Sequence, residues 1–163
     1  MKFQPDDLIV SKTDAKGRIT YCNDTFTDYA GYSEEELLGQ PHNMIRHPDM
    51  PRAVFRLMWN HLQRGKEFFG FVKNMRKDGG FYWTFANVTP SYDTDEKLLG
   101  YFSVRRYPVP EAVEIFTSLY ARMCERESQH SSSREAMDTS MEILQQAATE
   151  KGGYREFICS FYK

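Results

Sequence analysis

The segment from Asn43 to Pro51 combines residue types that can bind a polar ligand. It carries the guanidinium of Arg46, the imidazole of His47 and the carboxylate of Asp49, with two prolines close by. Each proline holds its own φ at about −65° and disfavours helix at the residue before it, so this backbone is stiff. A stiff segment loses little conformational entropy when it binds a ligand. We therefore expect this segment to contribute to a ligand site.

Each of these three side chains also has a structural interpretation. Arg46 can form a surface ion pair with a nearby carboxylate, and His47 can be a surface or capping residue of a loop. Asp49 lies just before an apolar helical pattern, where a carboxylate is a good N-cap. The sequence leaves these alternatives open, and for Asp49 capping and support of a site are compatible.

Two asparagines interrupt otherwise apolar strand patterns. Asn74 lies in the predicted strand 68–75 and Asn87 in the predicted strand 81–89. A carboxamide both donates and accepts hydrogen bonds, so two amides on neighbouring strands can bind the alternating edge of a heterocyclic ring. The alternative is that both face outward. Trp59 is similarly ambiguous, because it lies on the apolar stripe of a predicted helix and can pack in the core or line a pocket.

The elements that must position these residues follow from hydrophobic periodicity and turn signals. Asn23 or Asp24 caps a first short helix, and Ser33 opens a second one with a capping-box pattern. Pro51 is placed like the first residue of a longer amphipathic helix. The predicted elements are strands 8–13 and 18–21, helices 25–29, 33–38 and 51–65, and strands 68–75, 81–89 (ended by Pro90) and 98–107.

Strands and helices kept in separate runs predict an α+β fold with a five-stranded antiparallel sheet and short helices on one face. Pro108 and Pro110 mark a boundary, which gives an α+β domain at 5–108 and a helical extension at 109–163. Two apolar stripes predict a helical hairpin in that extension, followed by the apolar segment 154–161. The stripes are Val113, Phe116, Tyr120 and Met123, and then Met137, Met141, Leu144 and Ala148.

The composition excludes several classes of function. The net charge of −2 favours neither nucleic acid nor an anionic membrane, and the three widely spaced cysteines predict neither a disulfide framework nor a zinc site. Neither a signal-peptide pattern nor a long apolar run is present, so we expect a cytoplasmic protein without direct membrane insertion. No nucleophile elbow, phosphate loop or dinucleotide fingerprint occurs, so we expect no enzyme.

Residues 7–107 resemble a PAS domain. Gly31 to Gly39, Gly-Tyr-Ser-Glu-Glu-Glu-Leu-Leu-Gly, is similar to PAS domains in general. Pro41 to Pro51, Pro-His-Asn-Met-Ile-Arg-His-Pro-Asp-Met-Pro, is more specific and resembles the sensor domain of bacterial aerotaxis receptors. Segments 19–26 and 72–79 and the pair Tyr82-Trp83 extend the resemblance.

The resemblance implies a non-covalently bound FAD whose redox state reports oxygen or electron-transport status in aerotaxis and chemotaxis. It implies no catalytic or metal residues. The flavin-binding residues that it implies are Asn23, Arg46, His47, Asp49, Trp59, Asn74 and Asn87. Receptors of this family continue into membrane segments and a signalling domain that this sequence lacks. We therefore expect the signal to pass to a signalling partner or a second copy of the chain.

An alternative within the same fold is a dimerisation or adaptor module whose pocket is empty or holds another ligand, such as haem. Flavin absorbance, a Soret band or a colourless protein would distinguish these possibilities.

Overall fold

The computed structural model describes residues 4–162 and divides them into two compact units. The sheet unit comprises residues 4–47 and 61–108, and the helical unit comprises residues 48–60 and 109–162. The expected sensor domain, 5–108, therefore includes a segment, 48–60, that the structure groups with the C-terminal helices.

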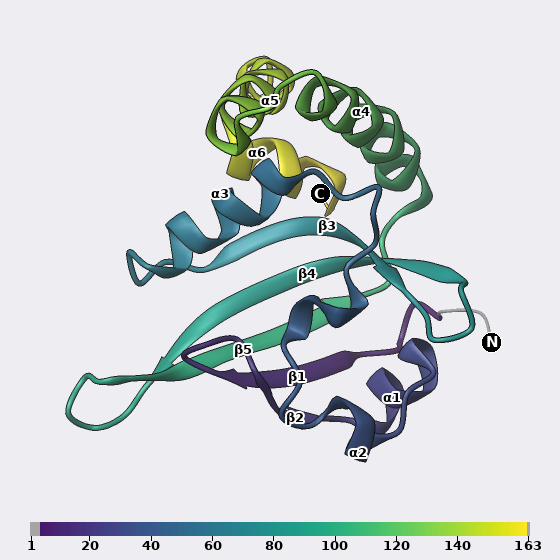
Figure 1. The fold of residues 1–163 in the computed structure, drawn as a ribbon, viewed down its shortest axis with the longest axis vertical. Coiled ribbons are helices and arrows are strands. Elements are labelled where there is room, and N and C mark those ends of the chain that lie inside the picture. Colours follow the sequence, from purple (N-terminus) through teal and green to yellow (C-terminus); the bar gives the residue numbers. More distant parts are fainter. Residues whose placement is uncertain (1–3, 163) are drawn as a thin grey trace. The chain divides into compact units, whose positions relative to one another are not determined.

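The sheet unit contains one five-stranded antiparallel sheet in the order β2-β1-β5-β4-β3. β1 and β5 run side by side in its middle (Figure 1). This architecture confirms the predicted fold class. The strands are β1 (Ile9–Asp14), β2 (Ile19–Cys22), β3 (Phe68–Met75), β4 (Phe81–Tyr92) and β5 (Leu98–Arg106).

β4 extends beyond Pro90, which we expected to end it. Pro90 pairs with Tyr101 of β5, and the strand continues to Tyr92. The pairing of β4 with β3 stops at Val88, so from there on β4 has a neighbour on one side only. A proline is tolerated at such an edge because no second strand needs its missing N–H.

The sheet has an inner and an outer face, which the register assigns residue by residue. Asn74 pairs with Tyr82, and Ala86 pairs with Arg105, so side chains at these four positions lie on one face. This inner face packs against α1 (Asp24–Ala30), α2 (Glu34–Leu37) and the 3-10 helix η1 (His42–Ile45). Their common core consists of Ile9, Ile19, Cys22, Phe26, Tyr29, Ala30, Leu37, Ile45 and Tyr82.

The caps of the short helices agree with the sequence. Asn23 is the N-cap of α1, and its Oδ1 accepts from the N–H of Phe26 at 3.1 Å. Ser33 and Glu36 form the predicted capping box of α2. These caps fix where the chain turns between β2 and the 3-10 helix, and therefore how that helix reaches the inner face.

The helical unit contains most of α3 (Arg52–Leu62) together with α4 (Pro110–Ser128), α5 (Ser133–Thr149), α6 (Tyr154–Cys159) and the 3-10 helix η2 (Ser160–Tyr162). α4 and α5 form the predicted hairpin (Figure 1). The buried seam of α5 recurs at every fourth residue, at Ala136, Ser140, Leu144 and Ala148. Met137 and Met141, which we expected in that seam, are half-buried beside it, because the small residues at 136 and 140 take the closest positions.

The start of α3 is held by Glu127 of α4. The Glu127 carboxylate accepts from the backbone N–H groups of Arg52 and Ala53, both at 3.0 Å, and from the hydroxyl of Ser140 at 2.9 Å. Glu127 is buried, and Arg52 Nε lies 3.3 Å from the same carboxylate. For these two N–H groups the acceptor is thus a residue distant in sequence, rather than Asp49 as we expected.

Candidate functional site

Five polar side chains from five elements converge on the inner face of the sheet. We call them the inner polar cluster: Ser11 (β1), His42 (η1), Asn74 (β3), Tyr82 (β4) and Arg105 (β5). Polar groups in such a position are costly to bury unless they are hydrogen-bonded. The cluster is therefore the candidate ligand site of the sheet unit.

Arg105 is the charged member of the cluster and is only 2% exposed. Its Nη2 donates to the Ser11 hydroxyl at 2.6 Å, and the guanidinium lies 4.5 Å from the centre of the Phe26 ring. Its Nε and Nη1 have no hydrogen-bond partner within residues 4–162. Burial lowers the pKa of Arg105 to about 10, which leaves it a cation at neutral pH.

His42 lies beside this cation. Its Nε2 is 3.0 Å from the Ser11 hydroxyl, and its ring stacks on Phe26 with 5.7 Å between centroids. Burial, reinforced by the nearby charge of Arg105, lowers the pKa of His42 to about 3. The imidazole is therefore neutral at physiological pH, and Arg105 carries the charge of the pair.

This neutral histidine predicts a pH-dependent stability. An unfolded histidine has a pKa of about 6.5, so between pH 6.5 and 3 the unfolded chain binds a proton that folded His42 does not. The contribution of neutral His42 to the free energy of unfolding is complete above pH 6.5. It falls by at most about 1.4 kcal/mol per pH unit as the pH drops from 6.5 to 3. The free energy of unfolding, measured with urea at several pH values in this range, should change less steeply with pH for His42→Asn than for the natural protein. Equal slopes, together with a His42 NMR signal that titrates near pH 6.5, would contradict this assignment.

Asn74 and Tyr82 lie opposite each other and complete the cluster at the β3 edge. Asn74 is 4% exposed and Tyr82 is 7% exposed. In the described chain, neither the Asn74 Nδ2 nor the Tyr82 hydroxyl has a hydrogen-bond partner of normal geometry. Burial raises the pKa of Tyr82 to about 12, against the opposing influence of Arg105, Arg76 and Asn74, so its hydroxyl stays protonated. Unpaired buried donors of this kind are ready to bind the acceptors of a ligand.

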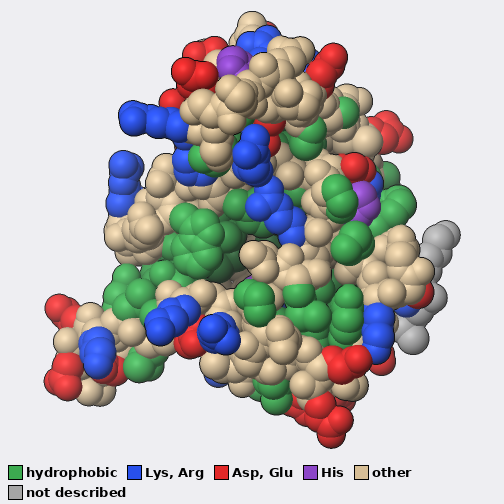
Figure 2. Space-filling view, viewed as in Figure 1, with side chains coloured by type: hydrophobic (Ala, Val, Ile, Leu, Met, Phe, Trp, Pro, Cys, Tyr) green, Lys and Arg blue, Asp and Glu red, His purple; other side chains and the backbone are tan. Residues whose placement is uncertain are grey.

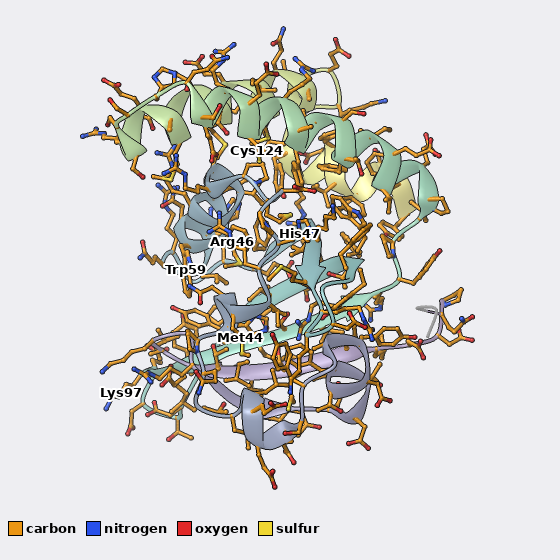
Figure 3. The ribbon with its side chains drawn as sticks, turned by 45° about the vertical axis from the view of Figure 1, so that its right-hand side comes forward. Met44, Arg46, His47, Trp59, Lys97 and Cys124 are labelled. Atoms are coloured by element: carbon orange, nitrogen blue, oxygen red, sulfur yellow. The ribbon has the colours of Figure 1, made fainter. Side chains whose placement is uncertain are left out.

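The stiff segment found in the sequence reaches this site through Arg46. Arg46 forms an antiparallel bridge with Asn74 at the open edge of β3. Partners across such a bridge project to the same face, so Arg46 lies on the side of Asn74 and its neighbour His47 on the other. The His47 ring meets Phe81 of the outer face edge-on, with 5.8 Å between centroids. Figure 3 labels Arg46 and His47, which follow the 3-10 helix along the chain.

Asn74 and Asn87 lie on opposite faces of the sheet, whereas we predicted that both amides bind one ring edge. Asn87 pairs with Phe69 and Val104, which puts it on the outer face, whereas Asn74 and Tyr82 are on the inner face. Asn87 Nδ2 lies 3.4 Å from Glu67 Oε2 and from the Phe68 carbonyl oxygen. The expectation was wrong because the two residues are an odd number of positions apart in the paired register.

The remaining predicted site residues lie outside the cluster. The Asn23 carboxamide serves the backbone: besides capping α1, its Oδ1 accepts from Val10 N–H at 3.0 Å and its Nδ2 donates to the Leu8 carbonyl at 2.8 Å. Asp49 is exposed, and its carbonyl accepts from Cys124 Sγ at 3.3 Å. Trp59 is half-buried on the part of α3 that belongs to the helical unit. A direct flavin contact by these residues, or by His47, stays a prediction.

Sequence reasoning missed Ser11, His42, Tyr82 and Arg105. One signal was available for Arg105, because it is followed by Arg106 at the end of a predicted strand. Adjacent strand residues point to opposite faces, so one of two neighbouring arginines must point inward in a sheet with a covered face. Arg106 is exposed and Arg105 is buried.

Other kinds of site find no support in the part of the chain that the structure describes. No group of three or more potential metal ligands occurs within 4–162. None of the helices described is long and apolar enough to cross a membrane. Both signs of charge occur over each unit on the face that Figure 2 shows, in keeping with a net charge of −2.

Comparison with known sequences identifies relatives. A family model described as PAS fold matches residues 19–105. The chain is 45% identical over 115 residues to the aerotaxis receptor of Escherichia coli, which covers 71% of this chain and 22% of that protein. It is 32% identical over 99 residues to the nitrogen fixation regulatory protein of Klebsiella pneumoniae, which covers 61% of this chain and 20% of that one. The chain thus spans about a fifth of the length of these curated relatives.

Solved structures share the fold at low sequence identity. A light-oxygen-voltage domain, solved in a study of a flavin analogue, matches with a TM-score of 0.59 and 20% identity over 68% of this chain and 83% of that one. A PAS domain from Colwellia psychrerythraea matches with a TM-score of 0.52 and 24% identity over 61% of this chain and 85% of that one.

Proposed function

This chain belongs to the PAS fold family and its sensor region is of the aerotaxis-receptor type, and from that premise we propose that it is a redox-sensing signal-transduction protein that binds FAD non-covalently. The inner polar cluster, on the inner face of the sheet, would hold the flavin ring. Its relatives are sensory and regulatory proteins, and we propose the same for this chain rather than an enzymatic activity.

The observation that carries this proposal is the set of unpartnered buried donors on the inner face. Within residues 4–162, two nitrogens of Arg105 have no hydrogen-bond partner, and Asn74 Nδ2 and the Tyr82 hydroxyl contact each other without normal hydrogen-bond geometry. The flavin ring presents carbonyl oxygens and ring nitrogens that accept hydrogen bonds, so a donor-rich site suits it. Asn74, Tyr82 and Arg105 are the residues that would hold it, with Arg46 beside Asn74.

A bound flavin supplies a reversible redox centre whose charge and protonation differ between its states. The chain's own residues respond to that difference. The Asn74 amide can rotate to exchange its donor for its acceptor, whereas Arg105 can only donate. Asn74 is therefore the residue whose hydrogen-bond pattern changes with redox state, and Arg105 is the constant one.

A change at Asn74 has a short route along the chain. Asn74 is bridged to Arg46, and Arg46 leads through His47 and Pro48 into α3. The first N–H groups of α3 are bound by Glu127, so movement of this segment changes contacts inside the helical unit. This route supports signal output through residues 109–162, to a signalling partner or to a second copy of the chain. We place the protein in the cytoplasm, because no disulfide joins its cysteines within the described residues, as expected in a reducing compartment.

The test is the flavin content of the purified full chain. We expect flavin absorbance in the protein as isolated, or after adding FAD and removing the unbound excess. The spectrum should bleach on reduction and recover in air. A protein that stays colourless after FAD addition overturns the proposal, and a Soret band assigns the pocket to haem instead.

A further inference from the structure

We propose that Arg105 is the cationic partner of the ligand. It donates hydrogen bonds to an acceptor-rich edge of the bound ring and favours the ligand form that carries more negative charge. This inference rests on the proposed function and adds to it a residue that sets the reduction potential. It also defines what the site selects, namely a planar ligand with adjacent acceptors that can hold a negative charge.

The first argument is the charge balance around Arg105. A guanidinium has five N–H donors and needs several acceptors, and a buried one normally pairs with a carboxylate. Here the hydrogen bond to Ser11 is its single protein acceptor contact, and no carboxylate pairs with it in the described chain. A buried cation without a counter-ion is unfavourable by itself, so its retention points to an acceptor supplied by a ligand.

The second argument is the direction in which the free donors are held. Ser11 on one side and the Phe26 ring 4.5 Å away fix the plane of the guanidinium. Asn74 Nδ2 and the Tyr82 hydroxyl, which make no hydrogen bond of normal geometry, lie on the same face of the sheet, and both Arg105 and Asn74 are close enough to lower the pKa of Tyr82. Three residues on three strands thus present unpaired donors to one region of the inner face.

The third argument is that the neighbours leave Arg105 as the fixed charge of the site. His42 is neutral and Tyr82 is protonated at physiological pH. The cluster therefore carries one positive charge whatever the ligand state. As a desolvated cation, Arg105 would stabilise a ring reduced by two electrons and one proton, which carries one more negative charge, more than it would stabilise the neutral form.

The test compares Arg105→Met with Arg106→Met. Arg106 is the matched control, because it is the next residue of the same strand, exposed and on the outer face. Midpoint potentials are measured on the flavin-loaded full chain, with xanthine as electron donor; its oxidation to urate by xanthine oxidase supplies two electrons, and water supplies the proton. We expect Arg105→Met to weaken binding of reduced flavin at least tenfold relative to binding of oxidised flavin. This corresponds to a fall of about 30 mV in the midpoint potential. Arg105→Lys should recover part of this shift, and Arg106→Met should show none.

A second readout separates ligand binding from structural support. Urea unfolding of the ligand-free chain should show Arg105→Met at least as stable as the natural protein, because the substitution removes a buried charge that lacks a counter-ion. Clear destabilisation with an unchanged potential would assign Arg105 a structural role and overturn the inference. If Arg105→Met retains too little flavin for a titration, the loss of flavin together with undiminished stability of the ligand-free chain supports the inference. The midpoint potential is then measured on Arg105→Lys.

Failure of the proposed function is distinguishable from failure of this inference. If the natural protein binds no flavin, the FAD proposal fails, yet the unfolding comparison still reports on Arg105. A more stable Arg105→Met chain then indicates that Arg105 is an unpaired cation whose partner is an anionic ligand other than flavin. A less stable one shows that the arginine serves the fold.

Discussion

Replacing Asn74 by leucine is expected to weaken flavin binding at least tenfold, about 1.4 kcal/mol, while leaving the ligand-free fold intact. Leucine has nearly the shape of asparagine, and within the described residues Asn74 Nδ2 makes no hydrogen bond of normal geometry, only a contact with Tyr82. The substitution removes a poorly satisfied buried donor from the ligand-free protein and a hydrogen bond from the flavin complex. Apo stability should therefore stay equal or rise, whereas affinity falls.

Asn87→Leu is the matched control for this experiment. Asn87 lies on the neighbouring strand but on the outer face, among the rings of Phe69, Phe71 and Phe85. We expect its flavin dissociation constant, measured by equilibrium dialysis, to stay within about twofold of the natural protein. Equal losses for the two variants would place the ring elsewhere, and a loss for Asn87→Leu alone would move the site to the outer face.

Replacing Glu127 by glutamine is expected to destabilise the protein by about 2–4 kcal/mol. The buried carboxylate accepts from two backbone N–H groups at the start of α3 and from Ser140, and its charge is favoured at a helix N-terminus. A glutamine amide keeps one acceptor and turns an N–H group toward these donors. Chemical denaturation of the full chain measures the loss.

Hydrogen exchange locates the effect of this change. The amides of Arg52 and Ala53 should exchange faster in Glu127→Gln, since their acceptor is weakened. Glu125→Gln is the control, because Glu125 is exposed on the same helix and should change stability by less than about 0.5 kcal/mol. If Glu127→Gln unfolds at the same urea concentration as the control, the carboxylate does not hold the start of α3.

Much of the local structure was predictable from the sequence. The capping box at Ser33, the cap at Asn23 and the strands beginning at Phe68 and Phe81 follow from short-range signals, and the structure has them. The exceptions depend on neighbours far along the chain. Pro90 remains in a strand because β3 stops short of it, and the α5 seam includes Ser140 because Glu127 needs its hydroxyl.

The candidate site was predictable only in part. The segment around Arg46 lies next to the inner polar cluster, because a bridge joins Arg46 to Asn74, two of the predicted residues. The same reasoning grouped Asn87 with Asn74, because composition does not reveal which face a strand residue occupies. The prediction that Arg46 and His47 both bind the ligand places two neighbours at one site, although adjacent residues of an extended backbone point to opposite faces.

The sequence by itself determined the fold class, the family and the stiff segment from Asn43 to Pro51, because these depend on periodicity, caps and prolines that act over a few residues. Only the tertiary structure decided which polar groups meet. Ser11 and Arg105 are 94 residues apart, and Arg52 and Glu127 are 75 apart, yet each pair shares a hydrogen bond. The register of the antiparallel strands and the packing of the helices determine these long-range contacts, and no local sequence pattern encodes either. Arg105, the charge on which the proposed redox chemistry depends, was therefore visible in the sequence as one of two neighbouring arginines, and became a ligand candidate only once the sheet showed which one is buried.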